Sequence, residues 1–110
     1  MKPTLDNFVE RLERMAKAIT PYARAKADRV YLELFLKSKI AILMGQSSKK
    51  TAVAREQYAR SHPEYLELLN GLRAAVEVEE RAKWALERFK IEVSLFQTQH
   101  ADERYLKDRV

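Results

Sequence analysis

The sequence predicts an all-α protein built as a long helical hairpin with the packing of an antiparallel coiled coil. Alternate steps of three and four residues from Tyr65 to His100 meet an apolar or aromatic side chain at nine of eleven positions, the repeat of a helix packed along one seam. The chain has only two glycines and three prolines, and no segment alternates with a period of two. The eleven seam positions are Tyr65, Leu68, Leu72, Ala75, Glu79, Ala82, Leu86, Phe89, Val93, Phe96 and His100.

The N-terminal half begins with the same repeat. Pro21 interrupts it, and Thr20 just before the proline can cap a new helix, so we expect a kink near this point. The pattern predicts one helix over about 5–19 and a second over about 21–44, which ends at Gly45 as a left-handed C-cap. The repeat positions are Leu5, Phe8, Leu12, Met15, Ile19 and Tyr22.

Two further helices complete the expected single domain, residues 1–110. A short helix is predicted over about 51–60, with Val53, Gln57 and Tyr58 on one side. Ser61 and Glu64 have the spacing of a capping box, so a long helix is predicted over about 62–107. Pro63 then falls in the first turn, where a missing N–H costs nothing.

The long helices carry more apolar surface than one seam uses. Because two residues turn a helix by about 200°, a second apolar stripe on the last helix lies near the face opposite the seam. The segment around "VYLELFL" is apolar almost all round, which is typical of a helix covered on every side. We therefore expect a homo-oligomer or, failing that, a docking surface for another protein, at Trp84, Ile91, Leu95, Leu32, Phe35 and Leu36.

Glu79 is polar within the predicted seam. Two interpretations stay open for it: an ion pair with a basic residue across the interface, or exposure at the edge of the seam. His100, the other polar position, is expected at the edge of the seam or beyond the end of the partner helix.

The positive charge is concentrated in the middle of the chain. The formal net charge is +5, and residues 37–62 alone carry six Lys or Arg against one acid, Glu56, which also gives +5. A patch of this kind attracts polyanions, although a solvated connector has the same composition. The six basic residues are Lys37, Lys39, Lys49, Lys50, Arg55 and Arg60.

Several functional classes find no support in the sequence. There is no cysteine, and His62 and His100 are not spaced as a ligand pair, so we expect no metal, no cofactor and no catalytic residue. The longest apolar run, "IAILM", is far shorter than a membrane span. The N-terminal stretch has charges every few residues, unlike a secretion signal, and we expect a cytoplasmic location.

Residues 50–104 carry a further pattern. A short-helix motif is followed by Pro-Glu-Tyr, a tryptophan about twenty residues later, an Ile-x-Val pair and a late arginine. This pattern resembles a group of small helical proteins encoded by tailed bacteriophages. Such proteins are typically encoded in early or recombination–replication gene clusters, beside single-strand-annealing and single-strand-binding proteins. The resemblance therefore implies a role in recombination or replication, within the host cell cytoplasm. It is carried by Thr51, Ala52, Arg55, Glu56, Pro63, Glu64, Tyr65, Trp84, Ile91, Val93 and Arg104.

Two functions follow as expectations. In the first, a non-enzymatic oligomer binds single-stranded or duplex DNA without sequence specificity through the six basic residues, in recombination or replication. In the second, the chain is a protein-interaction module, an adaptor or inhibitor of a host or phage protein, with no nucleic-acid contact. Tyr58 lies beside the arginines, where it either packs the short helix onto the hairpin or stacks on an unpaired base.

Overall fold

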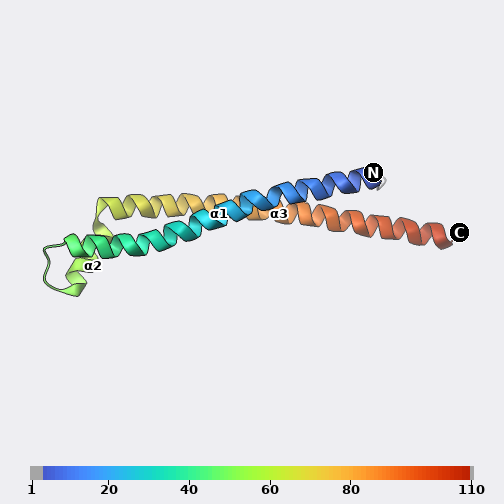
Figure 1. Ribbon diagram of the computed structural model, residues 1–110. Helices are drawn as coiled ribbons and strands as arrows, with labels where there is room; N and C mark the ends of the chain where they lie inside the picture. Colours follow the sequence, from blue (N-terminus) through green and yellow to red (C-terminus); the bar gives the residue numbers. More distant parts are fainter. Residues whose placement is uncertain (1–3, 110) are drawn as a thin grey trace. The chain divides into compact units, whose positions relative to one another are not determined.

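The chain folds into three α-helices in the computed structural model, which describes residues 4–109 (Figure 1). Helix α1 spans Leu5–Gln46, α2 spans Ala52–Ser61 and α3 spans Pro63–Arg109. At 1.5 Å per residue, α1 is about 63 Å long and α3 about 70 Å. The described residues contain no strand, so the predicted all-α class is confirmed.

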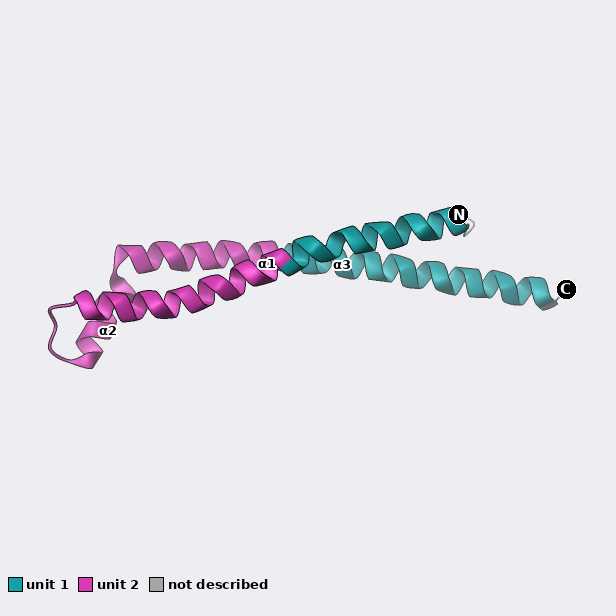
Figure 2. Cartoon of the chain, in the orientation of Figure 1, with its two compact units in different colours: residues 1–23, 80–110 teal, residues 24–79 magenta. Residues whose placement is uncertain are grey.

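The chain divides into two compact units, coloured separately in Figure 2. Unit 1 comprises residues 1–23 and 80–110, and unit 2 comprises residues 24–79. Unit 2 contains α2 together with the second half of α1 and the beginning of α3, whereas unit 1 is built from the remaining parts of α1 and α3 alone.

The predicted seam of the last helix is confirmed by burial. Every seam position from Tyr65 to Phe96 is buried or partly buried in α3, and only His100 is exposed. Gly71 does not interrupt α3, and its backbone has no positive φ. The apolar repeat therefore identified which side of α3 packs against α1.

The seam of α1 differs from the prediction at two positions. Leu5 is 76% exposed, and Ile19 is 49% exposed whereas Ala18 is partly buried. From Ala18 the seam continues through Tyr22 and Ala25, the spacing of four and three residues that keeps one helix face inward. Strict alternation of three and four residues predicted Ile19, whereas the structure takes two successive steps of three residues from Leu12 to Ala18.

Pro21 lies inside α1, and the break predicted there is absent. The proline is exposed, at the edge of the packed face, since it lies about 60° around the helix from Ala18 and about 40° from Ala25. The ring removes one backbone hydrogen bond, which disfavours a helix interior, but the packed side chains before and after it hold the helical path. The predicted kink is not confirmed.

The end of α1 also differs from the prediction. Gly45 belongs to the helix and has no positive φ, so it is not a left-handed C-cap. The backbone N–H of Ser47 donates to the carbonyl of Met44 at 3.2 Å and closes the last turn. Thr51 then caps α2, since its hydroxyl oxygen accepts from the N–H of Ala54 at 3.1 Å.

The capping box predicted at Ser61 is replaced by a histidine cap. Ser61 ends α2, and its hydroxyl donates to the carbonyl of Gln57 at 2.8 Å. His62 is the residue before α3, and its Nδ1 accepts from the N–H of Glu64 at 3.1 Å. The Glu64 side chain points instead toward Lys39, so it is not available for the reciprocal bond.

The core of unit 2 joins all three helices. Leu36 and Leu43 of α1, Ala59 of α2 and Tyr65 of α3 form one buried cluster. The inner side of α2 is therefore Ala59 with the partly buried Tyr58, whereas Val53, predicted on the same side as Tyr58, is 67% exposed.

Unit 1 packs through a two-helix interface. Leu86, Val93 and Phe96 are its buried residues. The ring of Phe8 stacks on Phe96 with centroids 5.1 Å apart, and the Arg11 guanidinium lies 5.0 Å from the same ring. Among the described residues, none of the helices combines the length and apolar character that crossing a membrane requires.

Candidate functional site

All six basic residues of the 37–62 segment lie in unit 2, on the end of α1, the connection after it and α2. Fold and charge therefore coincide in one compact unit. The six side chains are not equivalent, because their hydrogen bonds and ion pairs differ.

Lys39 holds the unit together. Its side chain is only 20% exposed, and its ammonium lies 2.6 Å from Oε2 of Glu64, which joins α1 to the first turn of α3. The hydrogen bond and the positive charge of Lys39 lower the pKa of Glu64 below its ordinary value. Lys39 therefore contributes an intramolecular contact, and its charge is already matched.

Arg60 is paired within α2. Its Nε donates to Oε1 of Glu56 at 3.0 Å, one helical turn away. That hydrogen bond raises the pKa of Arg60, and both side chains are about half exposed. Exposed pairs of this kind contribute little free energy, so the Arg60 guanidinium can exchange Glu56 for another anion at small cost.

Arg55 ties the connection to α2. Its Nε donates to the main-chain carbonyl of Lys49 at 2.7 Å, and the side chain is exposed. A guanidinium has five N–H donors in a planar fork, and this bond uses one of them. The contact therefore orders the segment before α2 and leaves most of the positive group facing solvent.

Lys37, Lys49 and Lys50 are the remaining cations of the segment. All three are exposed, and no carboxylate within the described residues forms an ion pair with them. The main chain of Lys49 is held by its N–H, which donates to the Ser47 hydroxyl at 3.1 Å, and by the bond from Arg55. The backbone is thus ordered while the ammonium groups stay available.

Tyr58 packs within unit 2. The residue is partly buried, and its ring lies edge-on to His62 with centroids 5.7 Å apart. This contact favours the packing interpretation of Tyr58 over stacking on a base.

The expected partner-facing residues separate into two groups. Leu36 is only 7% exposed and belongs to the unit 2 core, so its assignment to an external interface was wrong, and Leu32 is partly buried on the same seam. Trp84, Ile91 and Leu95 are more than half exposed on α3, and Phe35 is 37% exposed on α1.

The polar seam position Glu79 forms an ion pair across unit 2. Nε of Arg29 lies 2.5 Å from Oε2 of Glu79, and Nη2 lies 3.1 Å from Oε1. Both side chains are largely removed from solvent, and Arg29 also contacts Glu33 at 3.1 Å. The hydrogen bonds that Arg29 donates to Glu79 and then to Glu33 raise the pKa of Arg29. Such a two-point pair sets the register of α1 against α3.

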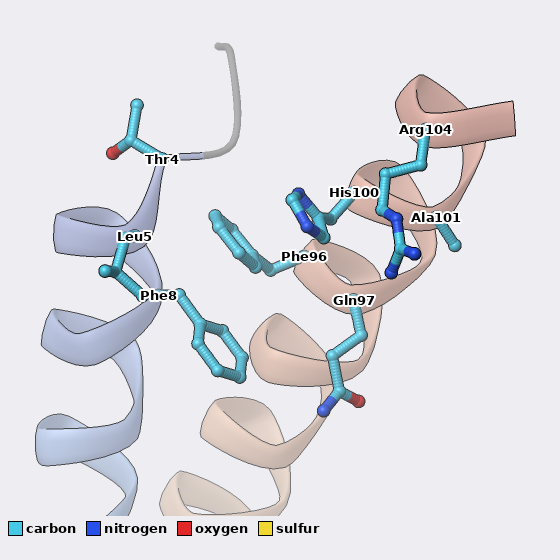
Figure 3. A pocket seen from close by; sticks show the side chains of 8 residues that line it. All are labelled: Thr4, Leu5, Phe8, Phe96, Gln97, His100, Ala101 and Arg104. Carbon is cyan, nitrogen blue, oxygen red and sulfur yellow. The ribbon is translucent and has the colours of Figure 1, made fainter. Parts of the chain in front are cut away.

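Unit 1 has a hollow that sequence reasoning missed (Figure 3). It has a volume of about 380 Å³ and lies between the first turns of α1 and the last turns of α3. Phe96 and His100 stack along one wall, with centroids 6.4 Å apart. Only the tertiary pairing of α1 with α3 brings its lining together: Thr4, Leu5, Phe8, Phe96, Gln97, His100, Ala101 and Arg104.

Residues 4–109 contain no group of three histidine or acidic side chains placed to hold a metal ion. Comparison of this chain with known protein families, curated proteins and solved structures finds no match.

Proposed function

We propose that this protein binds nucleic-acid backbone without sequence specificity, through the basic surface of unit 2. We define this surface as Lys37, Lys49, Lys50, Arg55 and Arg60; Lys39, expected in the same role, is assigned to the unit's own structure. The observation that carries the proposal is the absence of carboxylate partners for Lys37, Lys49 and Lys50 within the described residues. Exposed cations of this kind exchange small counterions for phosphates.

The ordered backbone supports the same proposal. Lys49 and Lys50 lie on a connection that hydrogen bonds from Arg55 and to Ser47 hold in place. A preordered cluster loses less conformational freedom on binding than a mobile loop does. Because the surface contains no exposed aromatic side chain, the contact we propose is with phosphates, not with bases.

We propose DNA recombination or replication in a bacteriophage as the biological setting. This part of the proposal rests on the resemblance carried by residues 50–104. A non-enzymatic role agrees with a surface composed of lysine and arginine alone.

Binding of labelled single-stranded and duplex oligonucleotides, measured by fluorescence anisotropy at several salt concentrations, tests the proposal. If all five residues contact phosphates, the logarithm of the association constant should fall against the logarithm of salt with a slope of up to about −4.5 for duplex. Replacement of Lys49→Glu with Lys50→Glu should weaken binding by about tenfold or more and reduce that slope by about two.

The matched control carries Lys17→Glu and Lys107→Glu. These lysines are exposed in unit 1, and both double variants lower the formal net charge from +5 to +1. The control should retain most of the affinity. Equal losses in the two variants, or no binding at low salt, would disprove a localised nucleic-acid surface.

A second function is favoured by one observation. Trp84, Ile91 and Leu95 are 65%, 59% and 58% exposed along one face of α3, and such a stripe suits a protein partner. Trp84 is the only tryptophan, so its emission reports burial of that face directly. An interaction module would show a blue shift with its partner and no salt-dependent affinity for DNA.

A further inference from the structure

Helix α1 carries a second heptad repeat in unit 2, separate from its seam. Its positions follow intervals of four and three residues, all are exposed, and none is charged. Phe35 and Ile42 lie beside these positions and are 37% and 49% exposed. We call the set the outer stripe: Ala27, Tyr31, Leu34, Ser38, Ala41 and Gly45, with Phe35 and Ile42 at its edge.

The outer stripe lies on the side of α1 away from α3. Arg29 marks the seam, and Tyr31 and Leu34 follow it by two and five residues, or about 200° and 140° around the helix. The equivalent outer positions of α3 in the same unit are polar or small: Glu67, Asn70, Ala74 and Glu77. An uncharged outer face is therefore a property of α1, and not of both helices in unit 2.

The apolar area is sufficient for a modest interface. Tyr31 is 66% exposed and Leu34 is 58% exposed. With Phe35 and Ile42, these side chains offer roughly 400 Å² per copy, so two copies would bury about 800 Å² from the four large residues, plus the small positions between them. That total approaches the lower end of the range for specific protein pairs.

The order of large and small residues fits a second copy running in the opposite direction. If the two α1 helices cross at Leu36, residues whose numbers sum to 72 lie at the same level. Leu34 of one copy then lies level with Ser38 of the other, Tyr31 with Ala41, and Ala27 with Gly45. Along the centre of the stripe each large side chain therefore meets a small one, whereas at its edge Phe35 lies level with Lys37 and Ile42 with Val30.

Charge favours the same direction. In a parallel pair, the basic segment of one chain, residues 37–62 with a net charge of +5, would lie beside the same basic segment of the other chain. The antiparallel pair places these segments at opposite ends of the contact and so separates them.

We propose that the outer stripe joins two copies of this chain as an antiparallel α1–α1 pair centred on Leu36. The proposal is tested separately from nucleic-acid binding, because Lys49, Lys50 and Arg55 lie outside the stripe and only Lys37 of the basic surface lies at its edge. It differs from the oligomer interface expected from the sequence, since Tyr31, Leu34 and Ile42 replace the partly buried Leu32 and the buried Leu36.

The mass of the full chain in solution, measured by light scattering and sedimentation across micromolar concentrations, tests the pairing. The expected mass is twice 12.9 kDa. Leu34→Glu should weaken the dimer by at least about 100-fold, since it places a charge against Ser38 of the second copy. Leu66→Glu is the matched control: it adds the same charge at a leucine that is 45% exposed on α3 of the same unit, and it should stay dimeric.

Circular dichroism of both variants should show retained helix, so that loss of the dimer is not loss of fold. A monomeric wild-type chain would overturn the proposal. The proposal would also be overturned if the Leu34→Glu variant stayed dimeric and the further change Leu95→Glu made it monomeric, because the interface would then lie on α3.

Cross-linking tests the direction, since the chain has no cysteine of its own. A mixture of Leu34→Cys and Ser38→Cys chains should form mixed disulfide dimers faster than either variant alone. Faster self-linking of Ser38→Cys would indicate a parallel pair and contradict the antiparallel register.

Discussion

The two units use the same helix–helix seam with different degrees of closure. In unit 2, α2 covers the cluster of α1 and α3, and Leu43 and Ala59 are 0% exposed. In unit 1 no third helix is present among the described residues, and its buried residues Leu86, Val93 and Phe96 keep 5–8% exposure. Two helices shield each other on one side only, so a ten-residue third helix is enough to close a core that a pair leaves open.

The polar contacts follow the same division. Unit 2 is held by the Arg29–Glu79 and Lys39–Glu64 pairs, which connect α1 with α3. Unit 1 relies on the Phe8–Phe96 stack and ends in the open hollow of Figure 3. Directional pairs select one register, whereas stacked apolar rings tolerate adjustment. We therefore expect unit 2 to be the more stable and the more uniquely ordered of the two.

The strongest test of this difference removes the same side chain from each unit. Leu43→Ala leaves a cavity beneath α2 and should lower the free energy of unfolding by about 3–5 kcal/mol. Leu86→Ala should cost about 2–3 kcal/mol, because its site is less enclosed and can collapse. Urea unfolding followed by circular dichroism gives both values. A larger loss for Leu86→Ala would contradict the closure argument.

Pro21 offers the next largest effect, in the opposite direction. Because it lies inside α1 in unit 1, Pro21→Ala restores a backbone hydrogen bond and should stabilise the protein by about 1–3 kcal/mol. Pro63→Ala is the control: Pro63 is the first residue of α3, where the missing N–H costs nothing, so the change should be near zero.

Hydrogen exchange locates the Pro21→Ala effect. Protection should increase for amides of α1 in unit 1 more than for those near Leu43. Equal or lower stability would mean that the proline is accommodated by strain-free bending of α1.

The smallest effect is the pH dependence of the Lys39–Glu64 pair. Lys39 lowers the pKa of Glu64 below its ordinary value of 4.5, so the folded state binds this proton less readily than the unfolded state. The stability that the pair contributes to the folded state is therefore present above pH 4.5, and it is lost as the pH falls through the lowered pKa of Glu64. Glu64 is 58% exposed, so the contribution is small.

Glu64→Gln should consequently flatten the acid side of the plot of melting temperature against pH by a small amount. Glu67→Gln, at an exposed position with no ion pair to it in the described residues, serves as the control and should leave the curve unchanged. An identical acid profile for wild type and Glu64→Gln would show that the Lys39 contact adds nothing to stability.

Several errors of the sequence-based prediction have a common cause. Ile19, Gly45 and Ser61 were each assigned from a local pattern: a strict alternation of three and four residues for Ile19, and residue types that favour a left-handed cap and a helix cap for Gly45 and Ser61. In the structure the seam passes through Ala18, α1 continues past Gly45, and His62 caps α3. Local preference is worth about 1 kcal/mol or less, and the phase of a long packed helix outweighs it.

The candidate binding residues were predicted in part. The basic segment was identified by charge alone, but charge does not distinguish Lys39, which is held by Glu64, from Lys49 and Lys50, which no acid among the described residues holds. Likewise, an almost continuously apolar stretch of α1 did not reveal that Leu36 faces inward and Leu34 outward. Leu36 lies two steps of seven residues after the predicted seam position Tyr22, whereas Leu34 follows no predicted seam position at that spacing, so the heptad repeat would have separated them.

The amino-acid sequence by itself determined the all-α class, the side of α3 that packs and the position of the basic segment, because each depends on residues close together along one helix. Only the tertiary structure decided which lysines remain free of acids, which cap begins α3 and which apolar face of α1 is left exposed. Those outcomes depend on residues up to fifty positions apart in the chain. Packing brings such residues, for example Arg29 and Glu79, within hydrogen-bonding distance. A helical repeat specifies a face, and its partner is specified by the fold.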